Sequence, residues 1–140
     1  MQSYFLSDDV VNAYLNDLTT RLKELPVPQQ PLMWCPLGPS GLILAKQLLK
    51  IAEPPEAIFP IVWKRGITEA SFSEPEASDR VRGSPVLILD TAIHSGATLA
   101  AAIRLSQASG CSSIISFALV VRCNAVIIPN FFSLLINDTD

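Results

Sequence analysis

The feature that most constrains the fold is an aliphatic run followed by an acid, a glycine turn and a helical segment, all within residues 84–110. Residues 86–89 are Val-Leu-Ile-Leu, and such an unbroken run is typical of a strand buried on both faces of a parallel sheet. We expect the strand to end at Asp90, and residues 99–110 to form a helix that Gly110 terminates. The run therefore predicts an inner strand of an α/β sheet with a carboxylate at its tip.

The turn between this strand and this helix suits a phosphate group. Ligands of parallel sheets collect at the carboxyl ends of the strands, and the first N–H groups of a following helix favour an anion. Gly96 lets the backbone approach a ligand closely, and the hydroxyls of Ser95 and Thr98 add donors. An ionised Asp90 is an acceptor that suits a pair of sugar hydroxyls or a hydrated Mg²⁺. The predicted ligand is a 5-phosphorylated sugar.

This stretch resembles the motif that binds phosphoribosyl pyrophosphate (PRPP) in type I phosphoribosyltransferases, and the likeness is greatest to the purine-salvage members of that family. Residues 87–98 carry it, as a hydrophobic strand, an acid and a Ser-Gly-Ala-Thr loop in succession. The resemblance implies that Asp90 holds the ribose hydroxyls and a Mg²⁺ cofactor. It also implies that the 5-phosphate lies against a loop formed by Ser95, Gly96, Ala97 and Thr98.

Two positions depart from the family motif. Thr91 stands where a second acid is expected, and its hydroxyl can contact the substrate through a hydrogen bond but brings no charge. His94 stands where an acid is common. It is a candidate catalytic residue beside Asp90, as a proton donor or acceptor near the base, and the alternative is an exposed loop histidine without a role.

An earlier part of the chain repeats the order of strand, glycine turn and helix. We expect a strand at residues 32–35 and a helix at residues 42–52, with Gly38 and Ser40 in the turn between them. The resemblance implies that this turn takes the pyrophosphate of PRPP, which makes both residues candidate ligands. A turn without any ligand explains the same residues equally well.

Residues 57–63 are expected to form a strand whose internal proline places it at a sheet edge or at a bulge. The polar stretch that follows, about 64–84, is expected to be a flexible loop, either a functional lid or a disordered segment. The resemblance implies that it closes over PRPP and that Lys64 and Arg65 contact the pyrophosphate. The alternative for these two cations is a solvated strand end.

The remaining segments complete an α/β chain. An amphipathic helix is expected up to about residue 25, and strands are expected at residues 112–122 and 128–138. Only residues 123–127 separate the last two strands, where purine-salvage relatives carry a longer insert that contacts the base. The expected fold is therefore a single-domain, Rossmann-like phosphoribosyltransferase fold over residues 1–140, with a parallel sheet, an N-terminal amphipathic helix and a reduced hood.

The composition of the chain limits the kinds of binding partner and cellular location that we expect. The net charge is −3 with ten Lys and Arg, which disfavours nucleic acid, and no run is long enough to span a membrane. Acids near the N-terminus do not suit a signal peptide, so we expect a cytoplasmic protein. An apolar fraction of 49% is high for 140 residues and predicts a homodimer interface. Cys35, Cys111 and Cys123 lack metal-ligand spacing and are expected to be apolar fillers.

Three functions remain open at this point. The first is a purine-type phosphoribosyltransferase with a trimmed base pocket. The second is a catalytically silent module that senses PRPP or a nucleoside monophosphate, and the third is an interaction scaffold. A serine hydrolase is excluded because adjacent His94 and Ser95 would have to meet as base and nucleophile, and the Gly-x-Ser-x-Gly elbow is missing.

Overall fold

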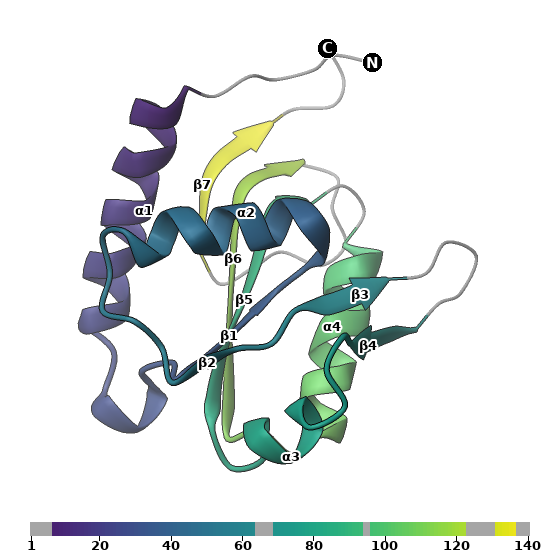
Figure 1. Ribbon diagram of the computed structural model, residues 1–140. Coiled ribbons are helices and arrows are strands. Elements are labelled where there is room, and N and C mark those ends of the chain that lie inside the picture. Colours follow the sequence, from purple (N-terminus) through teal and green to yellow (C-terminus); the bar gives the residue numbers. More distant parts are fainter. Residues whose placement is uncertain (1–6, 64–68, 94–95, 123–130, 137–140) are drawn as a thin grey trace.

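The protein is an α/β domain built on a parallel sheet (Figure 1). The structure is a computed structural model, and it describes residues 7–63, 69–93, 96–122 and 131–136. The elements in chain order are α1 (Asp8–Lys23), the 3-10 turn η1 (Val27–Gln29), β1 (Met33–Pro36), α2 (Gly38–Leu49), β2 (Ala57–Ile58), β3 (Ile61–Trp63), β4 (Ala70–Phe72), α3 (Ala77–Val81), β5 (Pro85–Ile93), α4 (Ala97–Ala108), β6 (Ser113–Arg122) and β7 (Phe131–Ile136). The expected α/β fold with a parallel sheet is confirmed.

The main sheet has the strand order β2-β1-β5-β6-β7, and every neighbouring pair in it is parallel. The predicted inner strand is therefore the central one, and β2 lies at an edge as its flanking proline indicated. Strands β3 and β4 form a separate antiparallel hairpin beside the sheet. In this arrangement the turns after β1 and β5 emerge side by side at one end of the sheet, since Pro36 pairs with Leu89.

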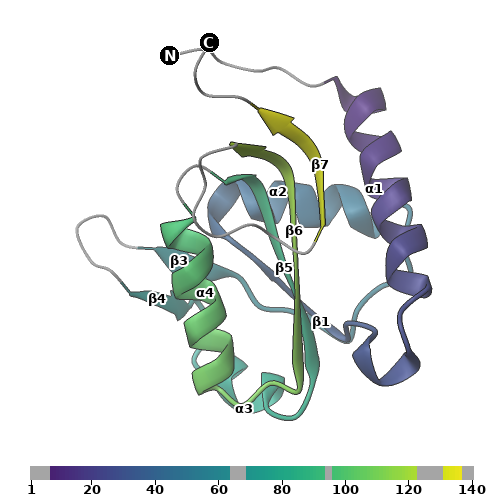
Figure 2. The same ribbon diagram turned by 180° about the vertical axis from the view of Figure 1, so that it is seen from behind.

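The alternation of side chains along β5 separates two buried clusters. Leu87 and Leu89 pack with residues of α1 and α2 on one face, whereas Val86 and Ile88 pack with α3, α4 and the hairpin on the other. All four side chains are fully buried, and burial of each aliphatic side chain of this size contributes about 1.5–3 kcal/mol. The sheet is thus a layer with helices on both faces, and Figure 2 shows α4 on the side opposite to α2.

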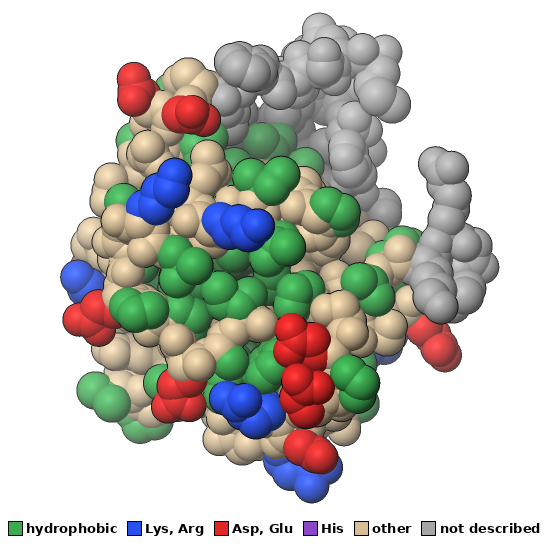
Figure 3. Space-filling model, in the orientation of Figure 1, with side chains coloured by type: hydrophobic (Ala, Val, Ile, Leu, Met, Phe, Trp, Pro, Cys, Tyr) green, Lys and Arg blue, Asp and Glu red, His purple; other side chains and the backbone are tan. Residues whose placement is uncertain are grey.

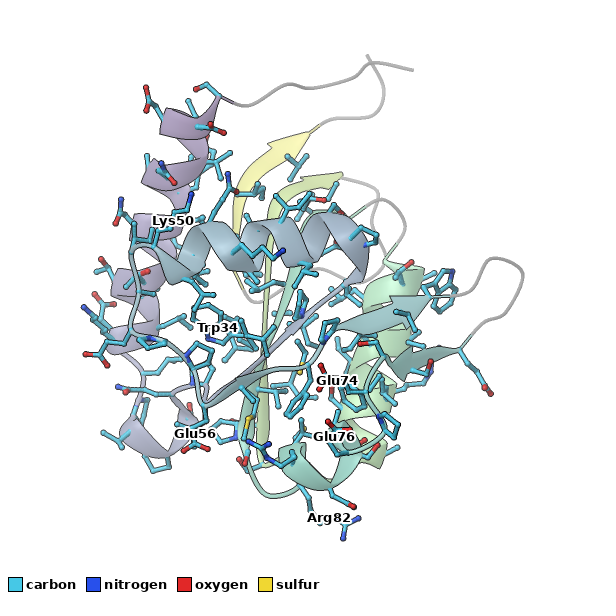
Figure 4. All side chains as sticks on the ribbon, viewed as in Figure 1. Trp34, Lys50, Glu56, Glu74, Glu76 and Arg82 are labelled. Atoms are coloured by element: carbon cyan, nitrogen blue, oxygen red, sulfur yellow. The ribbon has the colours of Figure 1, made fainter. Side chains whose placement is uncertain are left out.

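On the face crossed by α2, apolar side chains gather below that helix, and acidic and basic side chains are interspersed around them (Figure 3). Trp34 lies below α2 in the same view and is only 3% exposed (Figure 4). It belongs to the cluster that α1 and α2 cover. Among the described residues, no helix combines the length and the apolar character needed to cross a lipid bilayer.

Helix α1 begins and ends where its sequence provides the signals. Ser7 is the N-cap and accepts a hydrogen bond from the Val10 N–H at 3.4 Å, and two acids follow in the first turn. The helix stops at Lys23, just before a proline-rich connector. Its buried side chains are Val11, Leu15 and Leu18, which are part of the predicted helical pattern.

Three expectations about the elements were wrong in detail. The strand expected at 57–63 is divided at Pro60, because proline has no N–H for a sheet ladder, into β2 of the main sheet and β3 of the hairpin. Strand β5 does not end at Asp90 but continues to Ile93, because β6 extends alongside it and Val121 pairs with Ile93. Helices α2 and α4 begin earlier than expected, so Gly38 and Ser40 lie in the first turn of α2 rather than in a loop.

The described part of the stretch 64–84, expected to form a flexible loop, contains regular structure. Strand β4 pairs with β3, and α3 buries Ala77 and Val81 completely in the core. Short elements of this kind have little periodicity of their own and are fixed by the partners they pack against. Whether any part of this stretch closes over a ligand stays a prediction.

Candidate functional site at the carboxyl end of the sheet

A pocket of about 420 Å³ lies at the carboxyl ends of β1 and β5. This is the end at which ligands of open parallel sheets bind, and small-molecule sites have volumes of about 300–1,000 Å³. Its walls come from the starts of α2 and α4, the tip of β5 and the end of β3. The lining residues are Leu37, Gly38, Pro39, Val62, Trp63, Asp90, Ala92, Gly96, Ala97, Thr98 and Leu99.

The backbone of β1 and β5 places the two turns next to each other. The Leu37 N–H donates a hydrogen bond of 2.8 Å to the carbonyl of Leu89, the residue before Asp90. Leu37 also forms a parallel bridge with Ile61, which attaches the hairpin to the same end of the sheet. The pocket is therefore framed by residues far apart in sequence but fixed to one another by backbone hydrogen bonds.

Asp90 is the one ionisable side chain among the described residues that line this pocket. Burial raises the pKa of its carboxyl group from 3.8 to about 6, although hydrogen bonds from the backbone N–H groups of Thr91 and Ala92 act in the opposite direction. The Thr91 N–H donates to Oδ1 of Asp90 at 2.8 Å. A carboxylate that is poorly hydrated, in a pocket, and without a cation among the described lining residues is well suited to hydroxyl donors or a metal ion.

The wall opposite β1 is the start of α4. Gly96 is the residue before the helix and has a φ of 94°, in the left-handed region that glycine adopts at little cost. Its carbonyl oxygen accepts a hydrogen bond of 2.8 Å from the Ala100 N–H, which is the first backbone hydrogen bond of α4. Thr98 lies in that turn with its side chain partly exposed, and both it and Ala97 line the pocket. The N-terminal turn of a helix favours an anion through its N–H groups and its dipole.

The side chains of Asp90 and Thr91 lie on opposite faces of the sheet, because side chains alternate along a strand. Asp90 lines the pocket beside α4. Thr91 instead lines a second pocket of about 360 Å³ that α1, α2, β5 and β6 enclose. There its hydroxyl donates a hydrogen bond of 3.2 Å to the hydroxyl of Ser40.

The first turn of α2 approaches the tip of β5 very closely. A Cβ atom built on Gly41 would lie 2.7 Å from the carbonyl oxygen of Leu89 and 3.3 Å from the carbonyl carbon of Pro36. Only glycine permits this approach without a shift of the backbone. Gly38 begins the same helix with a φ of 65°. Gly41 directly precedes the helix expected at residues 42–52, and its packing role was not predicted from the sequence.

The structure brings together some of the predicted site residues and not others. Asp90, Gly38 and the three residues 96–98 line one pocket. Ser40 and Thr91 line the second pocket and contact each other. The remaining candidates lie outside the described residues, and they are His94, Ser95, Lys64 and Arg65.

Several lining residues were not predicted from the sequence. Val62 and Trp63 were assigned only to a strand, yet they end β3 at the pocket. The available signal was their position immediately before the candidate ligands Lys64 and Arg65. Leu37 and Pro39 were treated as turn residues, although they flank the candidate Gly38.

Among the described residues, neither Cys35 and Cys111 nor the basic side chains near α3 line this pocket. Cys35 is fully buried in the core, and burial, with a further effect of Cys111, raises the pKa of its thiol to about 12. This agrees with its expected role as an apolar filler. Arg82, labelled in Figure 4 near α3, is far from the starts of α2 and α4 in that view, and its side chain is 71% exposed. Among the described residues, no group of three His, Cys, Asp or Glu side chains is placed to hold a metal ion.

Comparisons with known proteins agree with this geometry. The profile of a family described as the phosphoribosyl transferase domain matches residues 27–126. A search of curated proteins gave no match. Among solved structures, a purine phosphoribosyltransferase from Pyrococcus horikoshii is 18% identical, with a TM-score of 0.80 over 98% of this chain and 90% of that one.

Two further solved structures have the same fold. A hypoxanthine phosphoribosyltransferase from Staphylococcus aureus is 18% identical, with a TM-score of 0.79 over 99% of this chain and 80% of that one. A hypoxanthine phosphoribosyltransferase from Trypanosoma cruzi, complexed with the product IMP, is 12% identical, with a TM-score of 0.75 over 99% of this chain and 82% of that one.

Proposed function

Because the chain belongs to the phosphoribosyl transferase domain family, we propose that the pocket between β5 and α4 binds the ribose 5-phosphate part of PRPP and of a nucleotide. The reaction is transfer of the phosphoribosyl group to a purine-type base. The observation that supports it most is that Asp90 and residues 96–98 line one pocket at the carboxyl end of the sheet. A carboxylate and a helix start are the two groups that a phosphorylated ribose requires.

In this proposal Asp90 accepts hydrogen bonds from the ribose hydroxyls, and the turn from Ser95 to Thr98 binds the 5-phosphate. During transfer the bond from ribose C1 to pyrophosphate breaks, a bond from C1 to a base nitrogen forms, and the base loses a proton. Positive charge develops on the sugar as pyrophosphate leaves, and a nearby carboxylate favours that charge. His94 is the proposed acceptor of the proton from the base.

The pyrophosphate is proposed to lie toward the start of α2 and the end of β3. Gly38 lines the pocket there, and Lys64 and Arg65 follow directly after Trp63 in the chain. Ser40 and Thr91 stay predicted substrate contacts, from the second pocket on the side of α1 and α2 rather than from the pocket that Asp90 lines. Cations beside a diphosphate form charge-assisted hydrogen bonds, which are about twice as strong as neutral ones.

Mg²⁺ is the proposed cofactor, and the donors fit it only in part. Asp90 is the single carboxylate among the described residues of the pocket, so the other ligands would be pyrophosphate oxygens and water. Mg²⁺ often binds in this way, through one or two carboxylates and the substrate's phosphates. When bound it would neutralise the leaving pyrophosphate.

A second function, a catalytically silent sensor of PRPP or a nucleotide, is supported by the orientation of Thr91. Thr91 stands where the family motif has a second acid, and its hydroxyl is engaged with Ser40 on the opposite side of β5. Among the described residues, Asp90 is therefore the single carboxylate that lines the pocket. A hydrogen bond to a charged group contributes about 1.5–3 kcal/mol. Loss of one such contact lowers a rate by roughly tenfold to a hundredfold and leaves binding possible.

We propose that the protein is a homodimer and that it is located in the cytoplasm. The exposed side chains of Ile43 and Leu49 on α2 support a subunit contact. The net charge of −3 and the interspersed charges in Figure 3 favour small-molecule ligands over nucleic acid.

Turnover separates the two functions. The full chain is incubated with PRPP, Mg²⁺ and a panel of purine and pyrimidine bases, and release of pyrophosphate is followed. The transferase predicts pyrophosphate release that depends on a purine base and is lost in Asp90→Ala. If the protein binds PRPP but releases no pyrophosphate with any base, it is the sensor. Absence of both PRPP binding and pyrophosphate release contradicts the whole proposal.

A further inference from the structure

We propose that the second pocket, which α1, α2, β5 and β6 enclose, binds the purine base of the substrate, and that Asp8 selects a base with an exocyclic amino group. This inference rests on the proposed function, because it takes the ribose and the 5-phosphate to lie between Asp90 and the start of α4. It adds the place of the base and a residue that determines which base is accepted.

The two pockets lie on opposite faces of β5 and meet near its tip. Strand β1 pairs with β5 only as far as Leu89, whereas β5 continues to Ile93. From Asp90 on, no described strand pairs with β5 on the side of β1. Ala92 lines both pockets. A ligand whose ribose is bound at Asp90 can therefore extend past Ala92 into the second pocket without crossing the sheet.

This arrangement keeps the base apart from the pyrophosphate. The pyrophosphate is proposed to lie in the first pocket, toward Gly38 and the end of β3. A base that displaces pyrophosphate in line approaches C1 of the ribose from the side opposite to the leaving group. The second pocket lies on the other face of β5, so the base and the pyrophosphate do not compete for the same space.

The second pocket combines an apolar wall with hydrogen-bonding side chains. Val11, Leu44 and Leu119 are at most 7% exposed and belong to the cluster that α1 and α2 cover. The hydroxyl of Thr91 and the amide of Gln47 supply both donors and acceptors. A ligand that satisfies this pocket has flat apolar faces and a polar edge. A nucleobase has this distribution.

Asp8 is the single charged side chain among the described residues that line the second pocket. It lies in the first turn of α1, which Ser7 caps. An ionised carboxylate only accepts hydrogen bonds, so it favours an amino group and disfavours a carbonyl oxygen. The Gln47 amide can present either its oxygen or its NH2 group, so it does not discriminate between them. Asp8 therefore favours adenine over hypoxanthine, which carries a carbonyl in place of the amino group.

Isothermal titration of the full chain at pH 8 with adenosine 5-monophosphate (AMP), inosine 5-monophosphate (IMP) and ribose 5-phosphate tests the inference. The wild-type protein should bind AMP about threefold to tenfold more tightly than IMP. Asp8→Asn should remove this preference, because an amide offers a donor as well as an acceptor, and Asp8→Glu should retain it. Asp9→Asn is the matched control and should also retain it, because Asp9 lies in the same turn, is exposed and is not among the residues that line the pocket.

Gln47→Leu tests the location of the base independently of its identity. Leucine keeps the apolar volume of the side chain and removes its hydrogen bonds. The variant should bind both AMP and IMP about threefold to tenfold more weakly and keep its affinity for ribose 5-phosphate within about twofold of wild type. Unchanged AMP and IMP affinities in Gln47→Leu contradict a base in the second pocket.

The ratio of the AMP and IMP affinities separates base recognition from stability, because a loss of folded protein lowers both affinities alike. A wild-type protein that binds IMP as tightly as AMP, or a preference that persists in Asp8→Asn, overturns the role of Asp8. Ribose 5-phosphate binding in the same experiment shows that the proposed function stands in that case. Absence of ribose 5-phosphate binding overturns the proposed function itself.

Discussion

Asp90 is held in a place that favours its neutral form. Burial at the tip of β5 raises its pKa from 3.8 to about 6, so the folded protein binds this proton more tightly than the unfolded chain does. The stability that this proton provides is complete below about pH 4 and is lost as the pH rises through about 6. Near neutral pH the charged group therefore lowers the free energy of unfolding of the ligand-free protein, as is common at functional sites.

Asp90→Asn should stabilise the ligand-free protein at pH 8 and leave its stability unchanged at pH 4. The asparagine oxygen can still accept the Thr91 N–H, while the charge is gone. We expect the free energy of unfolding to rise by about 1–3 kcal/mol at pH 8, since each pKa unit corresponds to about 1.4 kcal/mol. Urea denaturation at the two pH values measures it.

The control for this prediction is Asp79→Asn, because the Asp79 side chain is 86% exposed. It should show no pH-dependent gain. A gain in Asp90→Asn that is equal at pH 4 and pH 8 would mean that the effect comes from packing rather than from charge.

Thr91 illustrates what the sequence could and could not predict at this scale. The motif located Asp90, Gly96 and Thr98, and the structure brings all three to one pocket. The motif did not indicate on which face Thr91 would lie, because the strand was expected to end at Asp90. Since β5 continues to Ile93, the alternation of side chains directs Thr91 to the side of Ser40.

At the scale of elements, the contact between α2 and the tip of β5 sets the shape of the site. This contact depends on the absence of a side chain at Gly41, because a Cβ atom built there would lie 2.7 Å from the carbonyl oxygen of Leu89. The opposing atoms are backbone, so they cannot rotate away. Any side chain at this position must separate α2 from the sheet and widen the pocket on the side of Gly38.

Gly41→Ala should destabilise the protein although alanine favours helices. Overpacking of a well-packed contact costs about 1–3 kcal/mol, which exceeds the helix-propensity gain of about 0.5–1 kcal/mol. The measurement is the free energy of unfolding in urea. Ser40→Ala, in the same turn, removes only the hydrogen bond to Thr91 and should cost no more than about 1 kcal/mol. Equal costs for the two variants would contradict the proposed packing role of Gly41.

Long periodic elements could be predicted from the sequence, and short ones could not. Helix α1 has apolar residues at helical spacing and strand β5 has an unbroken aliphatic run, so the type of each element follows from its pattern. Strand β4 and helix α3 have three and five residues, too few to show a period. They form because β3 and the core offer partners. Val62 and Trp63 were missed as pocket residues for a different reason: the strand expected at residues 57–63 divides at Pro60, and its second half leaves the main sheet for the hairpin.

At the scale of the whole molecule, α2 presents apolar side chains to solvent. Ile43 is 62% exposed and Leu49 is 38% exposed, on a helix that also forms one wall of the site. Burying such side chains against a second copy of the chain removes them from water. The proposed homodimer would then couple the subunit contact to the first turn of α2.

We expect sedimentation velocity to show a dimer at micromolar concentration. Ile43→Asp should convert it to a monomer, because an interface disfavours an unpaired charge. Val27→Asp, at an exposed apolar position on η1, is the control and should remain dimeric. A wild-type protein that sediments as a monomer would refute the homodimer, and an unchanged dimer in Ile43→Asp would place the interface elsewhere.

The central claim is that one carboxylate and one helix start together bind a phosphorylated ribose, and isothermal titration with ribose 5-phosphate at pH 8 tests it most directly. At this pH Asp90 is ionised, since its pKa is about 6. The account predicts saturable binding to the wild-type protein and an affinity lower by about tenfold or more in Asp90→Asn, which loses hydrogen bonds to a charged group. Absence of binding to the wild-type protein, or equal affinity in Asp90→Asn, would contradict it.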